Sequence, residues 1–365
     1  MGYIAYLNGE KFFDTSVRSP NYDLIDPRVT LELGKAGSFN FTLPEDNLFY
    51  SRAWDRLSSY VDVYDTANPY VPIFAGRVYS RQMNFNKTLS ISCEGLLSIL
   101  NDTIVRPDTV SGNLYALSNS LRLAHNDQTG LFDDTRRQIA GFSHYLPGTV
   151  SITRTYDEYM TTLERMKELS DAADKKMRMI KNTSGNLYLD FLSEENFTEN
   201  KQGITLGRNL LDIQQYIDSK DHYTRLFPLG KKDTTTGQRL TIRSVNESVD
   251  FIQFIDSGPD QLGAERYCAT KIYDSITDAQ ELMDTATRDM NNDRSKGRII
   301  KVRVIDLLKD GVRNVGFRMG EKTQLFTRGR FPDIEGQWFY ISKQELHLLR
   351  PDLNKLELEC RIMNT

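Results

Sequence analysis

Cysteine is scarce in this chain of 365 residues, which contains only Cys93, Cys268 and Cys360. Their odd number and wide spacing argue against a disulfide framework and favour synthesis in a reducing cytosol. The chain also lacks a large excess of charge of one sign, because the formal net charge is −4 and no basic stripe runs along the sequence. Proteins that grip nucleic acid neutralise its phosphates with such basic stripes. We therefore expect no specific nucleic-acid binding.

Long apolar runs and targeting signals are missing from the sequence. No run approaches the roughly 18 apolar residues of a membrane-spanning helix. The N-terminal stretch MGYIAYLNGEKFFD has neither the apolar core nor the cleavage site of a secretory signal. Leu7 stands near the place where a myristoylation signal needs serine or threonine. We therefore expect no membrane anchor.

The composition is that of a globular protein, with 39% hydrophobic and 26% charged residues. A chain of this length predicts two to four domains. In residues 1–100, apolar residues alternate in SFNFTL and again in LSISC, which places them on one face of a sheet. Prolines interrupt these runs and mark turns between short strands. The region predicts a small antiparallel barrel or sandwich, which we take as the first β-barrel domain.

Residues 101–200 show helical periodicity instead. An apolar face repeats in NLYALSNSLRLAHN, and a second face repeats in TYDEYMTTLERMKEL. We expect Thr155 and Glu158 to form the capping box of the second helix. A β-hairpin that turns at Ser184 and Gly185 is expected to follow. The region predicts a peripheral α+β domain.

The remaining sequence returns to strands and carries one more helix. Residues 201–245 and 297–365 predict a second β-barrel domain, and residues 246–296 an inserted peripheral domain. We expect the helix of the insertion to begin at a capping box of Thr277 and Gln280 and to end at Gly297. The whole chain therefore predicts an α+β fold, mainly antiparallel β, with two similar barrels and two peripheral modules.

One pattern occurs twice in the sequence. SRQMNFNKTLSISCEG begins at Ser80, and SKQELHLLRPDLNKLELECR begins at Ser342. Both contain Ser, a basic residue and Gln, then Asn-Lys, then a Leu-x-(Ile/Leu)-x-Cys strand. We interpret them as matching hairpins of two duplicated β domains, with Cys93 and Cys360 buried at equivalent positions.

Sequence patterns of common catalytic, nucleotide-binding and metal sites do not occur. The histidines are widely separated and are interpreted as ordinary polar groups: His125, His144, His222 and His347. The stretch NNDRSKG at Asn291 does not have the spacing of a calcium loop and is interpreted as a helix end. We therefore predict no catalytic, cofactor-binding or metal-binding residue. A glycosidase-type carboxylate pair among the 50 acidic residues stays open.

Several motifs between Gly76 and Pro107 occur together: GRV at Gly76, CEG at Cys93, LND at Leu100 and RP at Arg106. In this order they resemble the N-terminal hub region of siphophage tail-associated lysins, also called prophage endopeptidase tail proteins. The stretches GSFNFTLPEDNLFY, NLLDIQQYIDSKDHYTRLFPLGKK, RLTIRSVNESVDFI and KQELHLLRPDLNKLELE are similar to that family as well. The resemblance spans nearly the whole chain, and several motifs in register are more specific than any one alone.

The resemblance implies a structural protein of a phage or prophage tail, similar to baseplate hubs. Such hubs resemble one another in forming homotrimers, so two barrels in each chain make a pseudo-sixfold ring at the virion tail tip. The implied partners are the distal tail protein, the tape-measure protein and the tail tube, with DNA only as passing cargo. The lytic domain of the family is expected to be absent from this chain, which predicts no enzyme activity.

Two other functions stay open at this stage. One is a peptidoglycan hydrolase that uses a carboxylate pair in residues 101–200. The other is a host-glycan-binding module, because the chain has 18 tyrosines and 18 phenylalanines.

Overall fold

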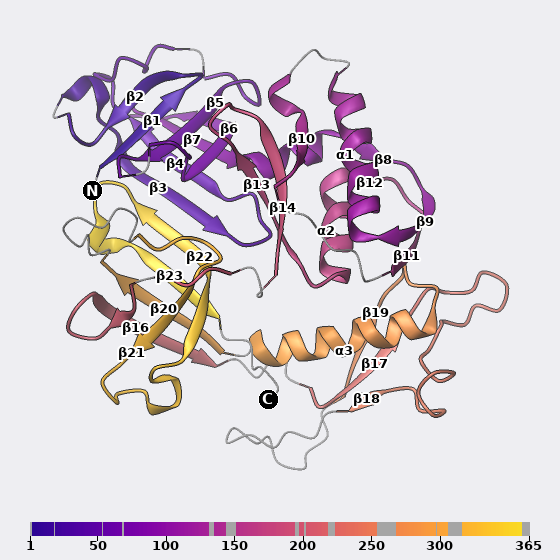
Figure 1. Cartoon of the computed structure of the whole chain (residues 1–365). Helices are drawn as coiled ribbons and strands as arrows, with labels where there is room; N and C mark the ends of the chain where they lie inside the picture. The colour runs from indigo at the N-terminus through magenta and orange to yellow at the C-terminus, as the bar shows by residue number, and fades with distance from the viewer. Residues whose placement is uncertain are drawn as a thin grey trace.

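The computed structural model of the chain is mostly antiparallel β structure with few helices, as the sequence predicts (Figure 1). It describes residues 2–17, 19–52, 54–67, 69–130, 135–143, 151–193, 197–200, 202–217, 223–253, 268–296, 298–305 and 316–359. The two strand-rich regions lie side by side, and the helices lie apart from them with smaller sheets (Figure 1).

A large sheet of 13 strands joins the beginning and the end of the chain. Its strands from the first region are β1 (Tyr3–Leu7), β2 (Glu10–Asp14), β3 (Ile25–Glu32), β4 (Ser38–Leu43), β5 (Tyr60–Asp65), β6 (Phe74–Met83) and β7 (Leu89–Gly95). Those from the second region are β15 (Ile204–Thr205), β16 (Leu210–Ile217), β20 (Arg298–Val304), β21 (Lys322–Phe326), β22 (Trp338–His347) and β23 (Lys355–Glu359).

The same arrangement of five strands occurs twice in this sheet. The order β3-β4-β7-β6-β5 in the first region matches the order β16-β20-β23-β22-β21 in the second. Matching strands also follow one another in the same order along the chain, and all neighbours are antiparallel. We call these groups the first and the second β unit. The correspondence ends beyond them, because β1 is antiparallel to β5 whereas β15 is parallel to β21.

The two β units are joined edge to edge by strand β22. Its first residues pair with β21, and residues 343–347 pair with β3 of the first unit. A bulge at Ser342 separates the two parts of the strand, and a bulge bends a strand at that point. The described strands therefore form one curled sheet that ends at β2 and β16. A closed barrel in either region stays a prediction.

The region of residues 101–200 contains two helices and several short strands. The helices are α1 (Leu114–Gly130) and α2 (Thr162–Ala172). The strands are β8 (Ile104–Val105), β9 (Asp108–Asn113), β10 (Ile139–Phe142), β11 (Ser151–Tyr156), β12 (Met160–Thr161), β13 (Lys176–Lys181) and β14 (Leu187–Leu192). The predicted hairpin is confirmed as β13–β14, and Gly185 in its turn has a positive φ of 84°.

The predicted start of α2 is wrong by six residues. The capping box is formed by Thr161 and Glu164 rather than by Thr155 and Glu158. Thr155 lies in β11, whose residues all pair with β9. Pairing with a strand more than 40 residues away therefore decides between two locally similar boxes.

The inserted region forms a small sheet covered by helix α3 (Ala279–Lys296) (Figure 1). The sheet contains β17 (Arg225–Leu229), β18 (Ile252–Gln253) and β19 (Cys268–Ile272). Strand β17 pairs here and not in the large sheet, where the sequence placed it. The expected apolar face of the helix is confirmed, because Leu282, Ala286 and Met290 are fully buried.

The start of α3 also differs from the sequence prediction. The Asp278 carboxylate accepts a hydrogen bond from the Glu281 backbone at 2.8 Å, so Asp278 rather than Thr277 holds the helix start. Gly297, the expected helix end, lies outside the described residues.

Several single turns of 3₁₀ helix complete the described chain: Pro20–Tyr22, Leu96–Asp102, Thr135–Arg137, Pro332–Ile334 and Pro351–Leu353. No helix among the described residues is both long enough and apolar enough to span a bilayer.

Candidate functional site: the polar face, the ion cluster and the cavity

The large sheet has one apolar face and one polar face that runs across both β units. In the second unit, the polar face carries Asp212, Gln214, Lys301, Arg303, Lys343, Glu345, Lys355 and Glu357 around a shallow hollow of about 290 Å³. It continues into the first unit, because Lys343 lies opposite Glu32 and Glu345 lies opposite Thr30. From there it passes through Ser38, Asn40, Thr42, Ser90 and Ser92.

Charges of opposite sign alternate across this polar face. Lys301 and Lys343 lie 3.4 and 3.5 Å from the Glu357 carboxylate. Arg303 lies 3.6 Å from Asp212, and Lys355 lies 3.8 Å from Glu345. Pairs of this kind add little to stability. Together with Glu32, they leave a hydrophilic surface on which the two signs of charge are balanced.

Three of the motifs between Gly76 and Pro107, namely GRV, CEG and LND, meet in one ion cluster around a buried arginine. The Arg77 side chain is only 2% exposed. Its Nε donates to Glu94 at 2.8 Å, and its two terminal nitrogens donate to Asp102 at 2.5 and 2.9 Å. The cluster thereby ties β6 and β7 to the 3₁₀ turn that leads into the helical region. These motif residues are structural, and the sequence analysis did not predict their contact.

Two glycines of the same motifs face each other between β6 and β7. Gly76 pairs with Gly95. A Cβ atom at Gly76 would lie 2.2 Å from the Glu94 carbonyl oxygen, and one at Gly95 would lie 1.8 Å from the Ala36 carbonyl oxygen. A side chain at Gly76 would push β6 away from β7, and a side chain at Gly95 would push β7 away from Ala36 in the turn between β3 and β4.

The histidines that the structure describes have structural surroundings. His125 is fully buried; its Nδ1 accepts from the Thr103 hydroxyl at 2.7 Å, and its Nε2 donates to the Arg137 carbonyl at 3.0 Å. Burial lowers the pKa of His125, which favours the neutral ring. Burial, and next the Arg28 cation, lower the pKa of His347. His144 and His222 lie outside the described residues.

The two described cysteines differ in their surroundings. Cys93 is buried and free, and burial raises the pKa of its thiol, as the neighbouring Glu94 also does. Cys268 is free and exposed. Cys360, the expected equivalent of Cys93, lies outside the described residues. No group of three His, Cys, Asp or Glu residues that could bind a metal occurs in the described part of the chain.

Carboxylates of the helical region are held by arginines. Arg165 contacts Asp108, and Arg178 lies 2.7 Å from the buried Asp190. Arg154 contacts Glu281 of the inserted region. A glycosidase needs two carboxyl groups that face the scissile bond of its substrate, whereas each of these carboxylates faces an arginine.

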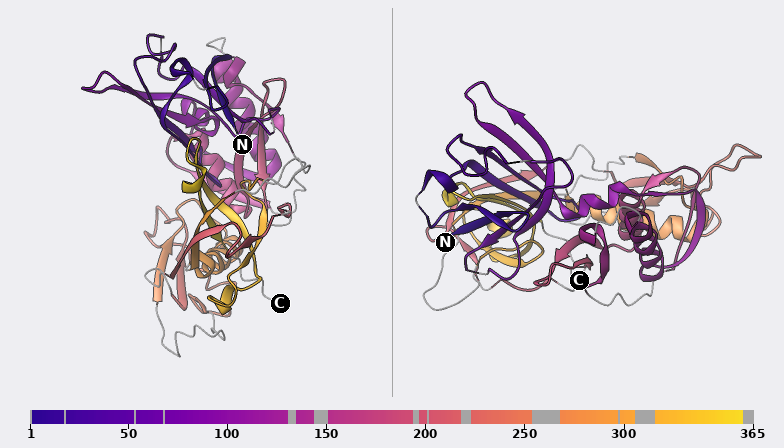
Figure 2. Two further views of the ribbon diagram at one scale, coloured as in Figure 1. Left: turned by 90° about the vertical axis from the view of Figure 1, so that its left-hand side faces the viewer. Right: turned by 90° about the horizontal axis from the view of Figure 1, so that it is seen from above.

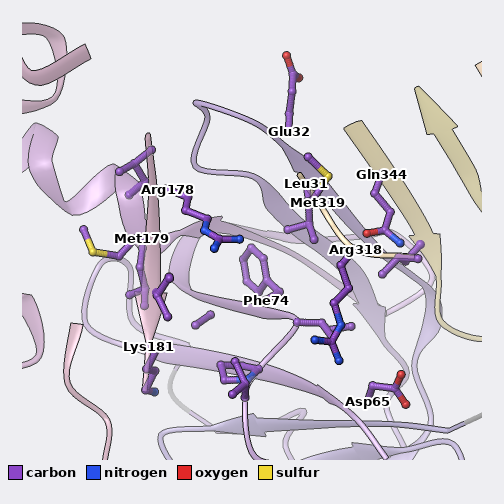
Figure 3. Close-up of a pocket in the computed structure, with 18 of the residues that line it drawn as sticks. Leu31, Glu32, Asp65, Phe74, Arg178, Met179, Lys181, Arg318, Met319 and Gln344 are labelled. Carbon is purple, nitrogen blue, oxygen red and sulfur yellow. The ribbon is translucent and has the colours of Figure 1, made fainter. Parts of the chain in front are cut away.

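A larger cavity of about 400 Å³ lies where the two β units meet strand β13 (Figure 3). Arg178 and Arg318 lie on opposite sides of it, with Phe74 between them (Figure 3). Two of the cations around the cavity are paired, since Lys181 lies 2.6 Å from Asp62 and Arg178 binds Asp190. The described lining contains neither histidine nor cysteine. The cavity lies at the junction of three parts of the chain.

No protein-family model and no curated protein matches the sequence of this chain. Solved structures do match its fold over nearly the whole length. A tail protein from Neisseria meningitidis MC58 superposes with a TM-score of 0.66 over 99% of this chain and 97% of its own, at 13% identity. A 43 kDa tail protein of prophage MuSo2 from Shewanella oneidensis gives a TM-score of 0.64 over 98% of both chains, at 10% identity.

This chain has the fold of prophage tail proteins. A third structure of this tail-protein fold, prophage tail protein gp18 from Listeria monocytogenes EGD-e, has a TM-score of 0.57 and 12% identity. It covers 99% of this chain and 95% of its own. The predicted resemblance to phage tail proteins is therefore confirmed at the level of the fold. The lysin designation, the trimer and the position at the tail tip stay predictions.

Proposed function

We propose that this protein is a structural hub of a phage or prophage tail, and that three copies close a ring at the tail tip. The observation that carries the proposal is the doubled strand order of the large sheet. Two similar β units in one chain make six units when three chains join, and cyclic closure is the usual form of soluble oligomers. Such a ring can meet a sixfold tail tube on one side.

The two faces of the sheet suit different positions in this ring. The polar face lines the central channel, where its balanced charges let DNA pass without binding. The apolar face packs on the cores, as in other half-buried antiparallel sheets. The helical region and the inserted region lie outside the ring.

We divide the chain into four parts on this basis. Residues 1–100 form the first hub domain, residues 101–200 a peripheral domain, and the last part of the chain the second hub domain. The insertion extends from about residue 223 to 296, since β17 pairs within it. The neighbours in the virion are the distal tail protein, the tape-measure protein and the tail tube.

Cryo-electron microscopy of the intact tail tip tests this proposal. We expect three copies around the tail axis, with the β units alternating in the inner wall and α1, α2 and α3 outside it. A single copy, six copies, or an inner wall made of helices would each refute it.

The proposal includes no enzymatic activity. Purified protein is expected to leave a peptidoglycan gel intact, because described carboxylates of the helical region are paired with arginines. Clearing of the gel that a single Asp or Glu substitution abolishes would contradict this expectation.

A further inference from the structure

The junction between the two β units is formed by strand β22, which pairs with β3. After the bulge at Ser342, β22 pairs with β3 so that Leu346 lies opposite Val29 and His347 opposite Arg28. The Leu348 backbone then donates to the Pro27 carbonyl at 3.0 Å. Through this pairing, Leu346 and Leu348 of the second unit enter the hydrophobic core of the first unit.

Strand β6, the counterpart of β22, has the same bulge but ends in solvent. Its bulge lies at Tyr79, between the pairs Val78–Cys93 and Ser80–Ser92. Before the bulge, β6 pairs with β5 on its outer side. After the bulge, no described strand pairs with that side. The hairpin that connects β6 to β7 extends from the body of the molecule (Figure 2).

Alignment of the two bulges makes the exposed tip of this hairpin equivalent to a buried segment. Met83 corresponds to Leu346, and Phe85 corresponds to Leu348. Leu346 is 5% exposed and Leu348 is 3% exposed, whereas Met83 is 61% exposed and Phe85 has no cover at all, at 107%. Met83 and Phe85 are therefore exposed to solvent, whereas their counterparts Leu346 and Leu348 are buried in the core of the neighbouring unit.

One edge of the sheet, strand β16, matches β3, which is the strand that pairs with the end of β22. Strand β16 is the counterpart of β3 and lies at the end of the sheet, bonded only to β20 among the described strands. The pair Phe39–Cys93 corresponds to Ile300–Leu358 when the units are aligned on their bulges. On this alignment, Gln215 corresponds to Val29, Gln214 to Arg28 and Ile213 to Pro27.

The free edge has the chemistry to receive the hairpin. Ile213 is only partly buried and packs on the core of the second unit, and Leu211 on the same strand is 45% exposed. The hairpin carries Arg81 and Lys87 and no acidic residue between Ser80 and Ser90. The β16 edge carries Asp212, and Gln215 on this edge donates to Asp333 at 3.1 Å. Opposite charges therefore accompany the apolar contact.

The hairpin lies far along the sheet from the β16 edge of its own chain. Six strands lie between β6 and β16 in the sheet. With neighbouring strands about 4.8 Å apart, the two edges are separated by roughly 30 Å along the sheet. An unpaired edge and an exposed apolar tip are features that natural sheets usually cover. At the internal junction, the equivalent edge of β3 is covered by β22.

We propose that β6 of one copy pairs antiparallel with β16 of a second copy, so that Met83 and Phe85 enter the core of the second copy's second β unit. In this register Asn84 lies opposite Gln214 of the second copy, and Phe85 lies over its Ile213. The inference rests on the proposed ring and specifies the contact that closes it, because each chain then offers one hairpin and receives one.

A disulfide across this contact tests the register. In a background with Cys268→Ser and Cys360→Ser, the pair Asn84→Cys and Gln214→Cys is expected to form disulfides between copies in assembled tail tips. Directly opposite residues in antiparallel strands are close enough for such a bond. Covalent dimers and trimers, but no larger products, are expected on a non-reducing gel.

Two matched pairs serve as controls. Arg28→Cys with His347→Cys occupies the equivalent positions of the internal junction and is expected to bond within one chain. Asn84→Cys with Glu10→Cys probes the other end of the sheet, at β2, and is expected to yield no bond between copies. Tips that contain three copies without the Asn84–Gln214 bond would overturn this inference and leave the proposed ring intact. Products larger than trimers would support the strand contact and overturn the ring.

Removal of the apolar tip is a second test. Phe85→Ser is expected to leave the unfolding of the isolated chain unchanged and to lower its incorporation into tail tips at least tenfold. Tyr70→Ser is the control, because Tyr70 is 70% exposed and lies outside the hairpin. Normal incorporation of Phe85→Ser would overturn the inference.

Discussion

Leu346 in β22 lies directly opposite Val29 in β3, so the end of the chain is bonded to its beginning as the next strand of one sheet. Both side chains belong to the same hydrophobic core. The two β units are therefore not independent: the first completes its core with residues that are more than 300 positions away.

This relationship predicts unequal costs for two equivalent substitutions. In the isolated chain, Leu346→Ala is expected to lower the free energy of unfolding by about 2–4 kcal/mol, because it removes buried methyl groups from a packed core. Met83→Ala, at the counterpart position, is expected to change it by less than about 0.5 kcal/mol, because Met83 is mostly exposed. Urea unfolding followed by circular dichroism measures both. Equal losses would contradict the bulge alignment.

The ion cluster around Arg77 predicts a large loss of stability on its removal. Arg77→Gln leaves Glu94 without its cation and leaves Asp102 with only the longer contact to Arg137, at 3.4 Å. It is expected to lower the free energy of unfolding by about 3–5 kcal/mol. Arg52→Gln is the control, since Arg52 pairs with Glu10 at 3.0 Å with both side chains more than half exposed. Its expected cost is at most about 1 kcal/mol. Similar unfolding midpoints for the two variants would show that the cluster is not structural.

The close approach of Gly95 to Ala36 predicts a sharp steric limit between β7 and the turn that joins β3 to β4. Gly95→Ala is expected to unfold the first β unit or to lower its melting temperature strongly, because the added methyl group would overlap the Ala36 carbonyl. Gly141→Ala in β10 is the control, where the nearest side-chain atoms are 3.9 Å away. Thermal unfolding compares them, and a normal melting temperature for Gly95→Ala would contradict the close approach.

The two described cysteines should differ in their reactivity toward thiol reagents. Cys268 is exposed and is expected to react within the first minutes, while Cys93 should react only after unfolding, because it is buried and its thiol pKa is raised. Mass spectrometry of labelled peptides distinguishes them. Rapid labelling of Cys93 in the native protein would refute its place in the core.

His125 predicts a loss of stability in mild acid. Its pKa is lowered by burial from an ordinary value of 6.5, so the unfolded chain binds the proton more tightly than the folded chain does. The free energy of unfolding therefore falls as the pH drops below about 6.5 and levels off below the folded pKa. His125→Asn is expected to flatten this dependence, measured by urea unfolding at several pH values. An unchanged slope would show that His125 is not the group responsible.

The local sequence predicts most individual helices and strands. It does not decide between two capping boxes that fit the same pattern equally well. The sequence around α2 contains two capping boxes, Thr155 with Glu158 and Thr161 with Glu164. The structure uses Thr161 with Glu164, because Thr155 is bonded into a strand pair with β9. No property of the box itself reveals that pairing.

The repeat was visible in the sequence, but its alignment was not. The shared letters equate Cys93 with Cys360. The bulges in β6 and β22 instead place Cys93 at the position of Leu358. The two alignments differ by two residues along this strand, which keeps the same face of the sheet, so only the paired strands define which residues correspond. The exposed apolar residues Met83 and Phe85 lie within the first copy of the repeated pattern, and only this alignment shows that their counterparts are buried.

The sequence by itself determined the class of structure, the positions of strands and helices, and the resemblance to phage tail proteins, because these follow from alternation, helical periodicity and short motifs. The tertiary structure decided what the motifs do: Arg77, Glu94 and Asp102 meet as a buried cluster. It also decided that the two β units share one sheet through β22 and β3. Both outcomes depend on contacts between residues far apart in the chain, and neither composition nor periodicity specifies which distant strands become neighbours.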